Sequence, residues 1–139
     1  MGKVTVKAKI RNFLDEGMAQ KGIIPPDEIR EIEVEGLVDS GATLLTLPEE
    51  MVEKLGLTLG REIEVSYADN RTEKRRVAFG VKVEILGREA LTHVVVERPG
   101  TKVLIGQIIL EALDLIIDPK RGILTPRPGH EDMPLIELL

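Results

Sequence analysis

The chain has 139 residues, a formal net charge of −5, 42% apolar and 31% charged residues, and no cysteine. This length and composition predict one globular domain over residues 1–139, and the lack of cysteine excludes disulfides, thiol catalysis and thiolate metal sites. An acidic chain with one short basic run, Lys74-Arg75-Arg76, and few aromatic residues argues against a nucleic-acid partner. No apolar run approaches the roughly 18 residues of a membrane span. The N-terminus carries no secretory signal, so we expect a cytoplasmic protein without a membrane partner.

Much of the chain alternates apolar and polar residues, and this period of two predicts half-buried strands. The apolar residues are mainly Val, Ile and Leu, which suit a sheet. Residues 11–27 lose the alternation and contain Gly17, Gly22 and Pro25-Pro26, so we expect a loop or an excursion there. The predicted strands are 4–10, 30–38, 44–47, 62–68, 75–86, 90–97, 103–106, 115–117 and 123–124.

Two short segments have helical features instead. Residues 48–56 begin with a proline, continue with two glutamates at the positive end of the helix, and stop at Gly56. Residues 107–113 place their apolar side chains on one helical face. Many short strands with one or two short helices predict a mostly β fold, namely a closed, mostly antiparallel β-barrel.

The most informative motif is residues 37–43, Leu-Val-Asp-Ser-Gly-Ala-Thr. The apolar run would deliver the carboxylate of Asp39 at the end of a buried strand. Ser40 can support a hydrogen-bonded scaffold, and Gly41 lets the backbone turn and lets a substrate or second chain approach closely. The same residues also have a purely structural interpretation, because Asp, Ser and Gly are common in turns.

This motif resembles the active-site signature of the aspartic proteases, Asp-Thr/Ser-Gly, and its Ala-Thr continuation is most similar to the retroviral type. Residues 103–113 resemble a second landmark of retroviral proteases, which is an apolar pair and a glycine before a short helix. Between the two lies a polar-tipped hairpin, where these enzymes carry a flap. The resemblance covers roughly residues 3–124 and leaves a C-terminal tail, 125–139. It implies a cellular, single-domain retropepsin-like protease with a closed antiparallel barrel of the retroviral protease type.

What the resemblance implies chemically is an aspartic endopeptidase that hydrolyses polypeptide substrates. The chain carries the signature once, so the second carboxylate would be Asp39 of a partner chain in a homodimer. Two carboxylates about 3 Å apart share a proton, because both cannot ionise cheaply. The ionised one takes a proton from water, and the protonated one donates to the scissile carbonyl oxygen. The mechanism implies no metal and no cofactor.

The resemblance also implies roles for the neighbouring residues. Ser40 would bridge the two active-site loops across the dimer. A hairpin tip near Tyr67 would cover the substrate, although packing is the plainer role of a lone aromatic residue on a strand. The implied site comprises the catalytic residue Asp39, the loop residues Ser40, Gly41, Ala42 and Thr43, and the flap residues Tyr67, Ala68, Asp69 and Asn70.

Several features depart from the viral pattern. The tip of the expected flap has no glycine. Thr43 and Gln107 are uncharged where viral enzymes usually carry an acid and an arginine that form an ion pair near the dimer contact. The terminal segments, Val4 to Val6 and Leu135 to Leu139, could interleave as strands at a dimer interface. The long tail could instead lie in the substrate groove.

The main alternative is a catalytically silent member of the same fold, which would act as a dimerisation or peptide-binding module and keep the acid for structure. A plain structural barrel with an accidental motif would be a stable monomer that is indifferent to Asp39→Asn. Other kinds of site are not favoured. His93 and His130 form no metal-ligand pattern, and Ser40 lacks the Gly-x-Ser-x-Gly frame of serine hydrolases.

Overall fold

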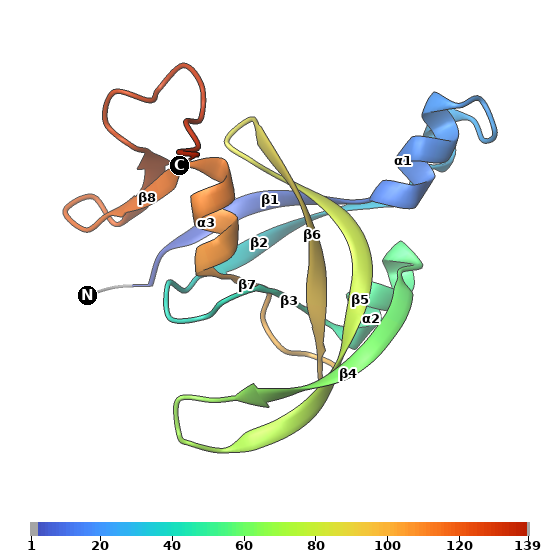
Figure 1. Cartoon of the computed structure of the whole chain (residues 1–139), viewed down its shortest axis with the longest axis horizontal. Coiled ribbons are helices and arrows are strands. Elements are labelled where there is room, and N and C mark those ends of the chain that lie inside the picture. Colours follow the sequence, from blue (N-terminus) through green and yellow to red (C-terminus); the bar gives the residue numbers. More distant parts are fainter. Residues whose placement is uncertain (1–2, 139) are drawn as a thin grey trace.

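The computed structural model describes residues 3–138, and this part of the chain is mostly β, with three short α-helices and one 3-10 turn (Figure 1). The prediction of a mostly β fold is therefore confirmed. The strands are β1 (Thr5–Asn12), β2 (Glu31–Val38), β3 (Leu45–Pro48), β4 (Thr58–Ser66), β5 (Thr72–Ile85), β6 (Arg88–Glu97), β7 (Leu104–Ile105), β8 (Leu115–Asp118) and β9 (Ile123–Pro126). The helices are α1 (Phe13–Gln20), α2 (Glu49–Leu55), α3 (Gln107–Leu113) and the 3-10 helix η1 (Pro26–Glu28).

Strands β1 to β7 form one sheet in the order β1-β2-β7-β3-β6-β5-β4, and β1 also pairs with β5. This second pairing of β1 turns the sheet into a ring, and β4 is attached outside the ring as the partner of β5. Most pairings are antiparallel, but β2 with β7 and β3 with β6 are parallel. The closed barrel of the retroviral type stays a prediction. So does the single domain over residues 1–139, whose first two residues and last residue lie outside the described range.

The core consists of aliphatic side chains, as the shortage of aromatic residues predicts. Ile10, Val83 and Ile105 come from three different strands and are fully buried. Helices α2 and α3 add Leu55 and Leu113, which are also fully buried. Burial of one such side chain contributes roughly 1.5–3 kcal/mol, so this cluster is the main source of stability.

For residues 11–27 the sequence predicts a loop or an excursion. The segment does leave the sheet, but it contains a helix, so the loop is wrong. Strand β1 continues to Asn12, and helix α1 follows directly. Asn12 caps the helix, because its Oδ1 accepts the backbone N–H of Asp15 at 3.0 Å. Its Nδ2 also donates to the carbonyl of Leu55 at 2.8 Å, which ties the helix start to the end of α2. A cap of this kind stabilises a helix by about 1 kcal/mol.

The buried face of α1 is charged, and for this reason its sequence lacks an apolar helical pattern. Asp15 accepts three hydrogen bonds from Arg30, one from the backbone N–H and two from the guanidinium. Glu16 accepts from Arg11 of β1 and Lys82 of β5, each at 2.7 Å. These partners satisfy two buried carboxylates that would otherwise be costly to remove from water. The excursion is thus fastened to the sheet by ion pairs.

The two predicted helices are confirmed as α2 and α3. Gly56 ends α2 with a φ of 63°, the left-handed conformation that its position after the helix predicts. Strand β4 begins at Thr58, earlier than the predicted 62, so the β4–β5 hairpin is longer than expected. No helix within residues 3–138 is long and apolar enough to cross a membrane.

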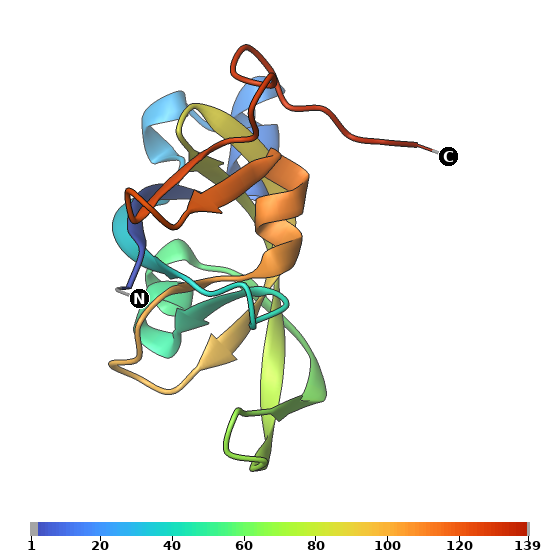
Figure 2. The ribbon, with the colours of Figure 1, turned by 90° about the vertical axis from the view of Figure 1, so that its left-hand side faces the viewer.

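The tail is anchored by two buried charged side chains, Asp114 and Arg88. The guanidinium of Arg88 donates to the carbonyls of His130 and Glu131. Asp114 follows α3 in the left-handed conformation and is 3% exposed. It accepts hydrogen bonds from Arg127 Nε at 3.0 Å and from the backbone N–H of Leu135 at 2.9 Å, and His130 Nδ1 lies 2.6 Å from its Oδ2. Beyond this anchor the end of the described chain extends away from the body (Figure 2).

Candidate active site

Asp39 lies at the point where β2 leaves the sheet. Three backbone hydrogen bonds fix the end of this strand, from Leu37 N to Val103 O at 2.8 Å, from Val38 N to Val4 O at 2.8 Å, and from Asp39 N to Ile105 O at 3.0 Å. The last of these extends the parallel pairing with β7 by one residue. The end of β2 is therefore held by two neighbouring segments before the chain turns, and Asp39 itself is held by one of them, at Ile105.

The loop from residue 39 to residue 44 is organised by Asp39 itself. Its Oδ1 accepts the backbone N–H of Gly41 at 2.9 Å, and its carbonyl accepts the N–H of Ala42 at 3.1 Å. Asp39 is half-buried, while Ser40 and Gly41 are exposed. A Cβ on Gly41 would lie 3.2 Å from Asp39 Oδ1, so a glycine here keeps the space next to the carboxylate open. Within the described residues, Asp39 Oδ2 makes no hydrogen bond and stays available.

Helix α3 holds the second half of the same loop. Its first two N–H groups, from Gln107 and Ile108, donate to the carbonyls of Ala42 and Thr43 at 2.8 and 3.1 Å. Gly106, directly before the helix, is buried against this loop. A Cβ at Gly106 would lie only 2.5 Å from the carbonyl oxygen of Leu44. The apolar strand, the glycine and the helix of residues 103–113 therefore form a seat for the Asp39 loop.

The uncharged residues Thr43 and Gln107 belong to the two segments of this seat, but each has another backbone partner. Gln107 N donates to Ala42 O, and Thr43 O accepts from Ile108 N. The side chain of Gln107 is directed along the helix, where its Nε2 donates to Glu111 Oε1 at 3.2 Å. The hydrogen bonds from the start of α3 thus connect the segments that an ion pair connects in viral enzymes.

The predicted flap residues lie at the tip of the β4–β5 hairpin. Tyr67 and Arg71 close the turn with a backbone hydrogen bond of 2.9 Å, and Asn70 takes a positive φ of 66° in place of a glycine. Ala68 and Asp69 are exposed. The hairpin tip and the loop between β2 and β3 both lie toward the left in Figure 1, and both views place the tip below the loop (Figures 1 and 2). No hydrogen bond or ion pair in the described part of the chain joins the tip to Asp39.

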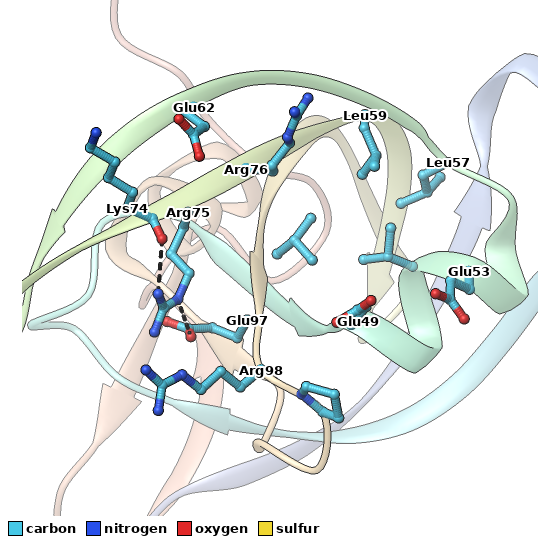
Figure 3. A pocket seen from close by; sticks show the side chains of 13 residues that line it. Glu49, Glu53, Leu57, Leu59, Glu62, Lys74, Arg75, Arg76, Glu97 and Arg98 are labelled. Atoms are coloured by element: carbon cyan, nitrogen blue, oxygen red, sulfur yellow. Dashed lines mark hydrogen bonds and ion pairs between the residues drawn. The ribbon is translucent and has the colours of Figure 1, made fainter.

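A hollow of about 400 Å³ lies between α2, the hairpin and the end of β6 (Figure 3). Its walls include Val52, Leu57 and Leu59 together with charged groups of β5 and β6, but no residue of the Asp39 loop. Glu97 and Arg75 face each other there, with Arg75 Nε donating to Glu97 Oε1 at 2.9 Å. From sequence, Arg75 belongs only to a basic run at the start of one predicted strand, and Glu97 only to the end of another. The sequence holds no signal for this pair, because the two residues are far apart along the chain and only the fold brings them together.

The two terminal segments expected at a dimer interface differ in how the chain itself uses them. Thr5 and Val6 pair with Leu37 and Gly36 of β2, so this edge of the N-terminal strand is used inside the chain. Residues 135–138 are exposed, and residue 139 lies outside the described range. The described residues contain no group of three or more His, Asp or Glu side chains placed to hold a metal ion.

The chain matches the family model described as gag-polyprotein putative aspartyl protease over residues 26–112, more than half of its length. The chain belongs to this family. The family is one of retropepsin-like aspartyl protease domains, so the predicted resemblance is confirmed. The matched region contains the Asp39 loop, the β4–β5 hairpin, Gly106 and most of α3, and it ends before the tail. No curated protein is similar enough to count as a relative.

Proposed function

We propose that this protein is an aspartic endopeptidase that acts as a homodimer, with the Asp39 side chains of two protomers as its catalytic pair. The observation that carries this proposal is the seat of the Asp39 loop. Ile105 fixes the backbone of Asp39, and the first turn of α3 fixes the carbonyls that follow it. Such a rigid support is what a carboxylate needs if it is to keep its position during a reaction.

Family membership and the single copy of the signature support the dimer. One chain offers one Asp39, and the chemistry of this family needs two acids at one water molecule. A twofold axis beside the exposed loop residues Ser40 and Gly41 would bring the second carboxylate to the first. Asp39 Oδ1 is engaged by Gly41, so Oδ2 is the oxygen that would face the water.

In the proposed reaction the two carboxylates, about 3 Å apart, share one proton. The ionised Asp39 removes a proton from the water as its oxygen bonds to the scissile carbonyl carbon, and the protonated Asp39 donates to the carbonyl oxygen. As the resulting diol collapses, the now ionised carboxylate takes a proton from one of its hydroxyls, the C–N bond breaks, and the other carboxyl gives its proton to the leaving amine. The products are a carboxylic acid and an amine, and the pair returns to its starting state.

The exposed hairpin supports a polypeptide as the substrate. A peptide that lies extended beneath a β-hairpin can form main-chain hydrogen bonds with it, as an added strand does. The tip residues Ala68, Asp69 and Asn70 are exposed and so are available for such contacts. We therefore propose that they and the Asp39 loop enclose the substrate from opposite sides.

The test is digestion of a diverse peptide mixture from about pH 4 to pH 7, followed by mass spectrometry, for the wild type and Asp39→Asn side by side. Cleavage by the wild type alone would support the protease and reveal its sequence preference. Cleavage by both proteins would contradict the role of Asp39. Binding of peptides by a dimeric wild type without cleavage would favour the alternative, a silent peptide-binding module.

A further inference from the structure

The β4–β5 hairpin is fastened to the end of β6 by a compact cluster of side chains, which we call the hairpin latch. It comprises Tyr67, Glu73, Arg75, Glu97 and Arg98. The first three belong to the hairpin, and the last two belong to the end of β6 and the segment that follows it. The latch offers a physical reason why a hairpin tip without glycine can keep one position.

Glu97 is the centre of the latch. Its Oε2 accepts the hydroxyl of Tyr67 at 2.5 Å, and its Oε1 accepts Arg75 Nε at 2.9 Å. The Glu97 and Arg75 side chains are only 12% and 13% exposed, so both charges are shielded from solvent. Loss of either one would leave the other buried without this partner. Figure 3 shows Arg75 reaching from the hairpin to Glu97, with Arg98 beside them.

Glu73 makes the second connection. It forms ion pairs with Arg75 at 2.9 Å and with Arg98 at 2.7 Å, and also with Arg71. The segment that carries Arg98 is itself held in place, because the N–H of Gly100 donates to Glu50 of α2 at 2.9 Å. Through Arg98, the hairpin is thus connected to a segment that α2 holds in place.

The protonation states fit a closed latch. Burial opposes ionisation of Glu97, but the hydrogen bonds from Tyr67 and Arg75 outweigh it and hold the pKa of this carboxyl below its ordinary value. Burial and the hydrogen bond to Glu97 raise the pKa of Tyr67, so its hydroxyl keeps the proton that it donates. The Tyr67 ring also lies under two guanidinium groups, those of Arg71 and Arg75, at 4.6 and 5.7 Å from its centroid.

We propose that Glu97 is a positioning residue that, through Tyr67 and Arg75, holds the hairpin tip in the position in which it meets the substrate. The role toward a substrate rests on the proposed protease function, whereas the contacts of the latch do not depend on activity. A hairpin that is ordered before binding spares the substrate the entropy of ordering it. Weakening the latch should therefore act on substrate binding more than on the chemical step.

The first experiment measures amide hydrogen exchange at residues 66–72 in the inactive Asp39→Asn background, so that no cleavage is needed. We expect Glu97→Gln and Tyr67→Phe each to speed exchange there by about tenfold, since the tip opens locally when its tether is lost. The matched control is Glu64→Gln. Glu64 is exposed on the same hairpin and forms no ion pair with the described residues. Unchanged exchange in both latch variants would overturn the proposal.

The second experiment measures kinetics on a peptide that the wild type cleaves. We expect Glu97→Gln and Tyr67→Phe to raise KM by about tenfold and to change kcat by less than about threefold, with no change in Glu64→Gln. An equal loss of kcat in the control variant, or a kcat effect without a KM effect, would contradict the positioning role. Absence of cleavage by the wild type would refute the proposed function and leave the exchange result to decide the latch.

Discussion

Gln107, the first residue of α3, donates its backbone N–H to the carbonyl of Ala42 at 2.8 Å, and this contact joins the two motifs of the chain. The motifs lie far apart in sequence, yet one supplies the carboxylate and the other supplies the seat of its loop. The donor is one of the N–H groups that every helix start leaves without an internal partner. The loop carbonyls satisfy these groups, so neither motif is complete without the other.

Gly106→Ala tests this seat. Its Cβ would lie 2.5 Å from Leu44 O and 2.8 Å from Ala42 O, and both are backbone atoms that cannot move aside alone. We expect a loss of about 1–3 kcal/mol in the free energy of unfolding, because overpacking must displace the Asp39 loop or α3. Chemical denaturation measures this loss of stability. Peptide cleavage should fall by more than the loss of folded protein explains.

The control for that variant is Gly17→Ala in α1, where the added Cβ would meet no atom within 4 Å beyond the nearby backbone of its own helix. Alanine is the better helix former, so we expect this change to stabilise the protein by about 0.5–1 kcal/mol and to leave cleavage intact. A Gly106→Ala variant as stable and active as Gly17→Ala would show that the seat is not needed.

Asp39→Asn should remove catalysis without removing the loop. The amide oxygen of an asparagine can accept the N–H of Gly41 just as Oδ1 of Asp39 does, so the turn keeps its hydrogen bond. We expect stability within about 0.5 kcal/mol of the wild type. Asp39→Ala cannot accept this bond and should be less stable than Asp39→Asn in the same thermal unfolding experiment. The reverse order would contradict the role of Asp39 in shaping the loop.

Asp15→Asn tests the charged attachment of α1. Asp15 is 2% exposed and accepts three hydrogen bonds from Arg30, whose guanidinium holds the pKa of this carboxyl below its ordinary value. Loss of the charge should lower the free energy of unfolding by about 1–3 kcal/mol at neutral pH. The contribution is present above the unfolded pKa of about 3.9 and is lost as the pH falls through the lowered folded pKa. The difference between wild type and variant should therefore shrink in acid, and a constant difference would contradict this assignment.

The hairpin latch should survive in mildly acidic solution. The pKa values of Glu73 and Glu97 are both held low, chiefly by Arg75 in the first case and by Tyr67 and Arg75 against burial in the second. A carboxyl with a lowered folded pKa stabilises above its unfolded value, about 4.3, and stops doing so as the pH falls through the folded value. Protection factors at residues 66–72 should stay constant from neutral pH down to about pH 5 and fall only below about pH 4. Loss of protection near pH 6 would contradict this.

The sequence allowed most of the sheet and the position of Asp39 to be predicted, because both depend on local patterns. Alternating apolar residues mark β5 and β6, and the segment from Val103 to Gly106 reads directly as a buried strand that stops at a glycine. The helix α1 could not be predicted in this way. Its buried face consists of Asp15 and Glu16, and their partners Arg30 and Lys82 come from other parts of the chain.

The hairpin latch escaped prediction for a related reason. The basic residues near Arg75 look like a solvated strand face, and only the fold brings Glu97 to them. Tyr67 had two possible roles in the sequence, packing or substrate contact. In the structure its hydroxyl donates a hydrogen bond to Glu97, and this bond helps to hold the hairpin in place. Charge pairs between distant segments leave no period in a sequence, whereas apolar faces do.

The most direct test of the shared catalytic pair mixes wild type with Asp39→Asn at constant total concentration and allows the subunits to exchange. If each site needs Asp39 from both protomers, total cleavage falls with the square of the wild-type fraction, to about a quarter in an equal mixture. If each chain works alone, cleavage falls in proportion, to about a half. The account predicts the first result, and the second would contradict it.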